Sequence, residues 1–486
     1  MVAAAGAALS AAGCEEAHEA SPCADSIGSH PLEGYRVLRL ILITICTLIF
    51  SGIAAGMGLS VQLFVEAGIG SSLCAPGENL CDRQFLFVSR AFNSAAGVAG
   101  ILQLFAGWLF DRAGGRVMST VAAALVAIGF VMLQIPLRGA QLGQDARTSG
   151  WLCAALLVAD TGAFMSTISG MAMIWHFPDL QTFVSALAGS AMSAAALVPL
   201  LLSALVHLTR WSLSAVMWAW LALVVLAGFC CHYTVPSLVE YRAKAESVLG
   251  TAVPLSARSS LWQMLLEGHA VLWRHWLLHA LAVIAFGVAL GWGMLYSSLL
   301  GDWGKLLFGS TVAGERLGAT YNVLTGIGGA LVTPVAAYAG DNAGNGPGLM
   351  LASMVVLSVI TSLIVPRPTW SAQVVTCASN SLLLCLGGAF LLAYVLAYAG
   401  PARFGVVNGL IMVYVSLIQL SLQGLVYKWI SSLSSAYFVH LSLPLQATSV
   451  FGTVVLAIWA AQILYLGLPA KPVTLAKDEE VLPLRH

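Results

Sequence analysis

The stretch GWLFDRAGGR, from Gly107 to Arg116, places an aspartate and two arginines between two long apolar runs, 98–110 and 117–136. Charged residues make up only 9% of the chain, whereas soluble domains carry about 25%. A cluster of three charges within ten residues is therefore unusual in this sequence. Because apolar runs flank the cluster on both sides, it marks a turn between two hydrophobic helices.

The composition of the whole chain places it in a membrane. Of its 486 residues, 59% are hydrophobic, and the mean hydropathy is +0.89. So much apolar surface requires lipid as its solvent, which makes the bilayer the first partner. The formal net charge is zero, which argues against a nucleic-acid partner, because that would need a basic surplus.

The hydrophobic segments predict an all-α membrane protein with twelve transmembrane helices, since one span needs about 20 apolar residues. The expected spans are 38–65, 84–110, 116–136, 151–175, 182–207, 212–235, 275–300, 315–340, 348–365, 371–399, 404–428 and 445–468. They form an N-terminal six-helix bundle over 35–235 and a C-terminal six-helix bundle over 275–468. The polar segment 236–274 is expected to be a cytoplasmic linker that contains an interfacial helix. We expect disordered cytoplasmic tails at 1–34 and 469–486.

A trace of internal duplication supports the division into two bundles. Asp111 and Gly114 follow the second span of the first half, and Asp341 and Gly344 follow the second span of the second half. The spacing within the two pairs is the same, as two repeats of six helices require.

Basic residues favour the side that would be cytoplasmic if both termini were inside, although the bias is small. This orientation puts the polar loop SSLCAPGENLCDRQ outside the membrane. Cys74 and Cys81 in that loop are then either a disulfide, if the compartment is oxidising, or two free thiols.

GWLFDRAGGR resembles the signature loop between helices 2 and 3 of the major facilitator superfamily, G-x-L-x-D-R-x-G-R-[KR]. Gly107, Asp111, Arg112, Gly114 and Arg116 match the pattern, whereas a glycine stands at 115 where a basic residue is common. The resemblance implies a major facilitator fold with the loop in the cytoplasm.

In that family the loop aspartate faces the cytoplasmic start of helix 11, here near Arg403 and Phe404. A helix N-terminus has unpaired N–H groups and stabilises a carboxylate. Asp111 is therefore expected to hold the two bundles together as an inner gate, with Gly107, Arg112, Gly114 and Arg116 in the same gating loop. The alternative is a simple topogenic turn.

Three further stretches resemble the system-L-type amino acid facilitators and the related apicomplexan amino acid transporters. They are FSGIAAGMG at 50–58, FPDLQTFVSALAGSAMSAA at 177–195 and PARFGVVNGLIMVYVSLIQLSLQ at 401–423. The resemblance implies a solute carrier that moves neutral or cationic amino acids across a membrane, most simply the plasma membrane. A proton or a counter-substrate is a further candidate partner.

Asp160 lies near the middle of the fourth expected span, where an ionisable group is costly. Its carboxylate either pairs with a substrate ammonium group or carries a proton. The alternative is a structural acid that is hydrogen-bonded to a hydroxyl such as that of Thr161. Five small residues either contact the substrate or serve only the close packing of helices: Ser51, Gly52, Gly56, Ser190 and Ser193.

Trp292 and Tyr296 lie on one helical face and either line a cavity or form an interfacial aromatic belt. Four uncharged polar residues lie at membrane depth: Asn322, Asn380, Tyr394 and Gln419. They fit a polar pore lining and interhelical hydrogen bonding equally well.

The sequence lacks the features that other classes of membrane protein would require. An organic anion or monocarboxylate carrier would need an arginine or lysine at mid-depth, and a membrane sensor with the same fold would carry a soluble domain. The sequence contains no catalytic, nucleotide-binding or metal-ligand motif. We therefore expect neither enzymatic activity nor a cofactor or metal.

Overall fold

The computed structural model describes residues 33–53, 55–75, 81–253, 260–343, 346–431 and 438–466. Within these ranges every regular element is a helix. The tails expected at 1–34 and 469–486 lie outside the described residues, apart from positions 33 and 34.

Ten helices and helical fragments in the described part of the first half account for the first six expected spans and the turn at α5: α2 (Arg36–Ser51), α3 (Met57–Glu66), α4 (Asp82–Gln141), α5 (Asp145–Thr148), α6 (Trp151–Gly170), η4 (Met171–His176), α7 (Gln181–Ala194), η6 (Ala195–Leu197), α8 (Val198–Thr209) and α9 (Leu213–Thr234). Three single-turn 3₁₀ helices lie in the connections: η2 (Glu33–Tyr35), η3 (Ser71–Leu73) and η5 (Pro178–Leu180).

The second half of the described chain begins with two helices in the expected linker and continues with six long ones: α10 (Leu238–Leu249), α11 (Leu261–Arg274), α12 (Trp276–Phe308), α13 (Thr311–Ala343), α14 (Gly346–Ile364), α15 (Trp370–Ala399), α16 (Phe404–Ser431) and α17 (Phe438–Leu466). Serine side chains start both linker helices. Ser237 accepts the N–H of Glu240, and Ser260 accepts the N–H of Gln263, which satisfies donors that a helix start leaves free.

The chain is an integral, multi-pass membrane protein. In its described part, eight helices are long and apolar enough to cross a membrane, and the pair α11 and α12, bent by 99°, is a ninth candidate. This number is below twelve partly because α4 runs through two expected spans. The pieces α2 and α3, with 16 and 10 residues, are each too short to count. Twelve spans therefore remain a prediction.

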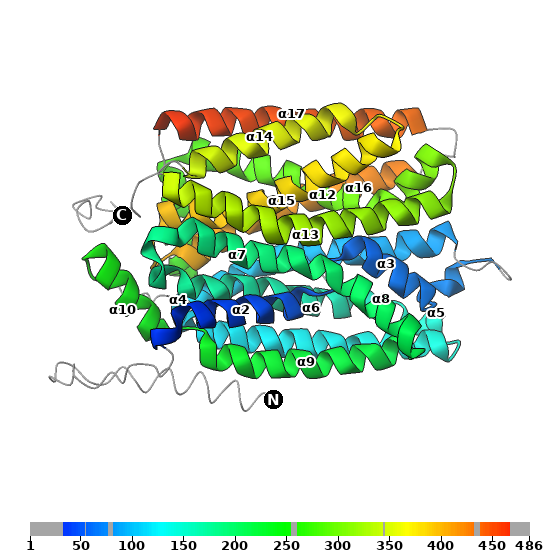
Figure 1. Cartoon of the computed structure of the whole chain (residues 1–486), viewed down its shortest axis with the longest axis horizontal. Coiled ribbons are helices and arrows are strands. Elements are labelled where there is room, and N and C mark those ends of the chain that lie inside the picture. The colour runs from blue at the N-terminus through cyan, green and yellow to red at the C-terminus, as the bar shows by residue number, and fades with distance from the viewer. Residues whose placement is uncertain are drawn as a thin grey trace.

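The long helices run side by side, with α10 at one end of the molecule and α5 at the other (Figure 1). We call these the α10 end and the α5 end. Most helices pack on others of their own half, but α7 and α16 pack most extensively on the opposite half. The two halves meet where α16 packs on α4 and where α7 packs on α13 and α15.

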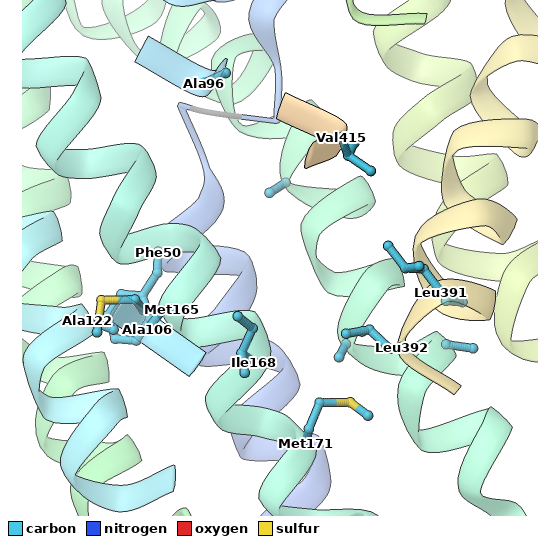
Figure 2. Packing of buried hydrophobic residues seen from close by; sticks show 14 of the residues in the cluster. Phe50, Ala96, Ala106, Ala122, Met165, Ile168, Met171, Leu391, Leu392 and Val415 are labelled. Atoms are coloured by element: carbon cyan, nitrogen blue, oxygen red, sulfur yellow. The ribbon is translucent and has the colours of Figure 1, made fainter. Parts of the chain in front are cut away.

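Small residues let the helices of the first half approach closely. A Cβ on Gly129 of α4 would lie 2.7 Å from the backbone nitrogen of Ala159, and one on Gly162 of α6 would lie 2.7 Å from the carbonyl oxygen of Ala122. Such contacts between backbones are typical of helix packing in lipid. Phe50 of α2 and Met165 of α6 fill the adjoining core (Figure 2).

Candidate functional site

Asp111 joins the two halves of the molecule at the α10 end. Its side chain is buried, and its two oxygens accept the backbone N–H groups of Gly405 and Val406, each at 2.8 Å. These donors belong to the first turn of α16, where helical N–H groups have no partner within the helix. A carboxylate at this position also meets the positive end of the helix dipole. We call this pair of hydrogen bonds the Asp111 latch.

Glycine is required where α4 crosses α16 beside this latch. A Cβ on Gly107 would overlap the carbonyl group of Gly405, and a Cβ on Gly405 would overlap the carbonyl oxygen of Gly107. The two backbones are therefore in direct contact. The first glycine of the signature loop lets Asp111 reach the start of α16.

The turn itself depends on Gly114, whose φ of 80° and ψ of 174° interrupt α4. This φ is one that residues with a side chain rarely adopt. The Cα of Leu238 would also lie 2.7 Å from a Cβ at this position. Gly115, the departure from the family pattern, has a packing reason too, because a Cβ there would lie 2.6 Å from the Cβ of Ala172.

The two arginines of the loop have different surroundings. Arg112 is exposed and lies over the ring of Trp108, with its guanidinium carbon 5.4 Å from the ring centroid. Arg116 faces the linker: its backbone N–H binds the carbonyl of Pro236 at 3.1 Å, and its Nε donates to that of Val235 at 3.2 Å. Arg116 therefore holds the chain that leads into α10.

A buried ion cluster fixes α10 to the first half of the molecule. Glu240 accepts hydrogen bonds from Arg39 at 2.6 and 3.2 Å and lies 3.2 Å from Nε2 of His176. Arg116 is 4.0 Å from the same carboxylate. Burial opposes ionisation of Glu240, but the hydrogen bonds from His176 and Arg39 and the charge of Arg39 outweigh it and lower its pKa below the ordinary value.

The next residue of α10 extends this contact to the second half. Tyr241 is buried, its ring packs edge-on against Phe110 with centroids 5.5 Å apart, and its hydroxyl donates to the carbonyl of Pro401 at 3.4 Å. Burial raises the pKa of Tyr241 above its ordinary value, so it is a neutral donor. The linker helix thus touches both halves beside the Asp111 latch.

A second carboxylate binds across the halves at the same end of the molecule. Oδ2 of Asp341, near the end of α13, accepts the N–H of Phe183 in the first turn of α7 at 2.9 Å. Asp341 is the repeat partner of Asp111, and α7 in the first half corresponds to α16 in the second. The repeated aspartates therefore make the same type of contact. Gly344 lies outside the described residues.

A cavity of about 240 Å³ lies between the two halves. Its lining comes from the α2–α3 break, α4, α6, α7, α12, α13, α15 and α16. Apolar side chains such as Ile168, Leu391 and Leu392, labelled in Figure 2, form much of the wall. None of the described residues that line it has a carboxylate, guanidinium, ammonium or imidazole group.

Two of the residues expected to contact a substrate line this cavity, Ser193 of α7 and Gln419 of α16. The other ten lie outside its lining: Ser51, Gly52, Gly56, Asp160, Ser190, Trp292, Tyr296, Asn322, Asn380 and Tyr394. Sequence reasoning did not single out Gln103 or Asn408, whose amide side chains do line it. The lining is known only from the packing of helices distant in sequence, so no local pattern would have found these two amides.

The glycines of the first span have a packing role in the structure. A Cβ on Gly52 would lie 2.8 Å from Val198, and one on Gly56 would overlap the ring of Pro199. The break between α2 and α3 therefore packs on the start of α8. The hydroxyls of Ser51 and Ser190 are buried and have no hydrogen-bond partner among the described residues.

Asp160 is buried in α6 with 2% of its surface exposed. The hydroxyl of Thr161 donates instead to the carbonyl of Leu157 at 2.7 Å, so it is not the partner of this carboxylate. Phe164, one helical turn further along α6, does line the cavity.

The remaining polar candidates bind other side chains or the backbone. Tyr296 stacks on Trp292 with centroids 5.1 Å apart and donates to Gln373 at 3.2 Å. Asn322 donates to the carbonyl of Gly56 at 3.5 Å, which links α13 to the α2–α3 break.

Two further polar candidates belong to contacts within the second half. The amide of Asn380 donates to the Tyr321 hydroxyl at 3.4 Å, and the Tyr394 hydroxyl lies 2.8 Å from Nδ1 of His279. These two side chains serve interhelical hydrogen bonding in this arrangement.

A disulfide joins Cys74 and Cys81 at the α5 end, with 5.6 Å between their Cα atoms. Asp145 of α5 holds the preceding turn, because it accepts the N–H groups of Gly70 and Ser72 at 2.8 and 3.0 Å. A covalent bond and a buried carboxylate thus hold the described residues on either side of this segment.

The fold matches solved structures of the major facilitator superfamily. The proton:xylose symporter XylE bound to 6-bromo-6-deoxy-D-glucose aligns over 90% of this chain and 98% of its own, with a TM-score of 0.59 and 13% identity. A double-tryptophan variant of XylE aligns over 89% and 95%, with a TM-score of 0.58 and 15% identity. At this identity the likeness establishes the fold alone: the chain has a major facilitator fold. No family model and no curated protein sequence matches it.

Proposed function

We propose that this protein is a secondary transporter that moves amino acids across a membrane by alternating access. The observation that carries the proposal is the cavity between two halves whose contacts at the α10 end are hydrogen bonds from carboxylates to helix starts. Such bonds break and re-form without rearrangement of a packed core. Residues 107–116 provide the contact on α4.

In this mechanism the Asp111 latch closes the α10 end while the α5 end opens, and it separates when the α10 end opens. A hydrogen bond to a charged group contributes about 1.5–3 kcal/mol. Two such bonds from Asp111 are strong enough to favour one state and weak enough to release. The bond from Asp341 to Phe183 adds a second latch of the same kind, and the α10 helix binds both halves beside the first.

The amino acid assignment rests on the resemblance of 50–58, 177–195 and 401–423 to amino acid facilitators. All three stretches contribute to the cavity wall, through Ala55, Gly189 and Asn408 among others. We also propose twelve spans with both termini in the cytoplasm, so that the α10 end faces the cytoplasm and the disulfide loop faces outward. The plasma membrane is the proposed location.

Uptake of radiolabelled amino acids in expressing oocytes tests the proposal. The full panel of twenty is offered at several pH values, with and without unlabelled amino acid inside the cell to reveal exchange or proton coupling. We expect saturable uptake of a subset above the level of uninjected cells. Background uptake of every amino acid by protein that has reached the cell surface would reject the substrate assignment.

A carrier of another small organic solute is the second candidate. The absence of charged side chains from the described cavity lining favours an uncharged solute such as a sugar. The same feature disfavours a monocarboxylate, which would need a cationic partner at this depth.

A further inference from the structure

The cavity wall contains amide groups that no protein group uses. The side chains of Gln103 in α4 and Asn408 in α16 line the cavity and make no hydrogen bond to any described residue. They are only 5% and 1% exposed, and Oδ1 of Asn408 is fully buried without a partner. Buried polar groups in proteins almost always have partners. These two amides are therefore available to bind a ligand that supplies hydrogen-bond donors and acceptors.

The two amides come from neighbouring positions across the contact between the halves. A Cβ on Gly409, which follows Asn408, would lie 2.8 Å from the carbonyl oxygen of Gln103. The α4 and α16 backbones thus touch beside both side chains. A ligand held by both amides would bridge the two halves, as a substrate of alternating access must do.

Two hydroxyl groups elsewhere on the wall already have partners. Thr325 pairs with Ser381 at 2.6 Å, and Ser193 donates to the carbonyl of Gly189 at 3.0 Å. The amides of Gln103 and Asn408 and the hydroxyl of Ser416 are available for recognition, and an apolar surface that includes Phe164 and Leu391 forms another part of the wall.

A charge that loses its water in the cavity needs a partner of opposite sign, because burial of an unpaired ion is strongly unfavourable. The described lining supplies no such partner. Asp160 is a carboxylate on α6, but the cavity wall near it is formed by Phe164. An amide can bind either an ammonium or a carboxylate group without changing the net charge of the site.

We infer that this cavity selects a solute without net charge, recognised by Gln103 and Asn408, and that among amino acids it accepts those with uncharged side chains and rejects cationic and anionic ones. This inference rests on the proposed transport function and narrows its substrate class. Gln103 and Asn408 are its specificity-determining residues.

Two pairs of ligands of matched size test the inference with the full chain in liposomes: L-norleucine against L-lysine, and L-glutamine against L-glutamate. We expect the uncharged member of each pair to enter at least about tenfold faster, since a missing partner for a buried charge gives discrimination of this order. Equal or faster entry of lysine or glutamate would overturn the inference and leave amino acid transport standing. If all amino acids fail and an uncharged sugar such as D-xylose enters, the amino acid assignment falls and the uncharged cavity stands.

A charge placed in the wall gives a second, independent test. Gln103→Glu supplies a carboxylate at constant size, and we expect the ratio of lysine to norleucine uptake to rise about tenfold. Gln141→Glu, the same change at the exposed end of α4, is the matched control and should leave the ratio unchanged. Asn408→Asp repeats the test from α16 if Gln103→Glu reaches the membrane poorly. An unchanged ratio in well-inserted variants would contradict the assignment of these residues.

Discussion

Individual residues of the signature loop have separable physical roles. Asp111 binds the start of α16, Gly107 permits the contact between backbones, and Gly114 makes the turn. The aspartate and glycines therefore act on the junction between the halves. Arg116 instead holds the entry to the linker.

Substitution of Gly114 by alanine should destabilise the protein. Its φ of 80° and ψ of 174° cost a residue with a Cβ about 1–3 kcal/mol, and the Cβ would also meet Leu238 at 2.7 Å. We expect a clear fall in the unfolding temperature of detergent-purified protein. Gly150→Ala is the control, because a Cβ there meets nothing within 4 Å and its φ is −59°. Equal melting of the two variants would exclude the steric explanation.

Asp160 provides a second prediction at this scale. Because its carboxylate is buried without a hydroxyl partner, we expect Asp160→Asn to insert normally and to abolish or strongly reduce uptake. Asp179→Asn, at an exposed position, is the control. Uptake kinetics near those of the native protein would show that the Asp160 charge has no direct role.

At the scale of elements, the linker is more than a tether. Its helix α10 binds the first half through Glu240 and the second through Tyr241. Its companion α11 packs on α16 through Gly268, whose Cβ would lie 2.9 Å from Leu410. Exposed Trp262 and Trp273 on α11 suit an interfacial position beside the bilayer.

The attachment of α10 should depend on pH through Glu240. Because the folded protein lowers the pKa of Glu240, this carboxylate stabilises the fold above its unfolded pKa of about 4.5, and the contribution is lost as the pH falls through the folded value. Glu240→Gln should therefore lower the melting temperature at pH 7, and the difference from the native protein should shrink as the pH falls below about 4.5. Glu66→Gln, at an exposed site, should show no such convergence. A difference that stays constant with pH would refute the role of the ionised group.

At the scale of the whole molecule, two latches related by the internal repeat join the halves at the α10 end. At the opposite end the link from Asn322 to Gly56 and the bond from Gln423 to Asn93 at 3.1 Å also cross between the halves. The cavity lies between these two sets of contacts. Several hydrogen bonds therefore join the halves on each side of the cavity.

Loss of both latches should open the cavity from the α10 end. Cys385 lines the cavity, so its alkylation by a small membrane-impermeant thiol reagent, located by mass spectrometry, reports access. We expect faster modification in Asp111→Asn and faster still in the double variant with Asp341→Asn. Cys377, buried outside the cavity lining, is the internal control. Unchanged modification of Cys385 in the double variant would show that these aspartates do not close the α10 end.

Much of the helical arrangement was predictable because apolar runs of span length have no alternative to helices in lipid. The expected segment 371–399 agrees within one residue with α15 at 370–399, and the expected segment 212–235 agrees equally well with α9 at 213–234. The breaks after Ser51 and Ala194 were not expected, because composition does not reveal where a helix is interrupted. In the structure the two breaks pack on each other, because Gly56 lies directly against Pro199.

The sequence by itself determined the membrane class, the position of the turn at Gly114 and the aspartate, Asp111, that binds the other half. Hydropathy and a short local motif carry that information. Only the tertiary structure decided which groups face the cavity and which ions cluster. Arg39 and Glu240 are 201 residues apart, and the backbone of Gln103 lies against Gly409, next to Asn408, only because α4 packs on α16. Side chains of the same polarity either bind a neighbouring helix, as Asn380 does, or remain free, as Asn408 does. That difference depends on the packing of helices distant in sequence, which no local pattern encodes.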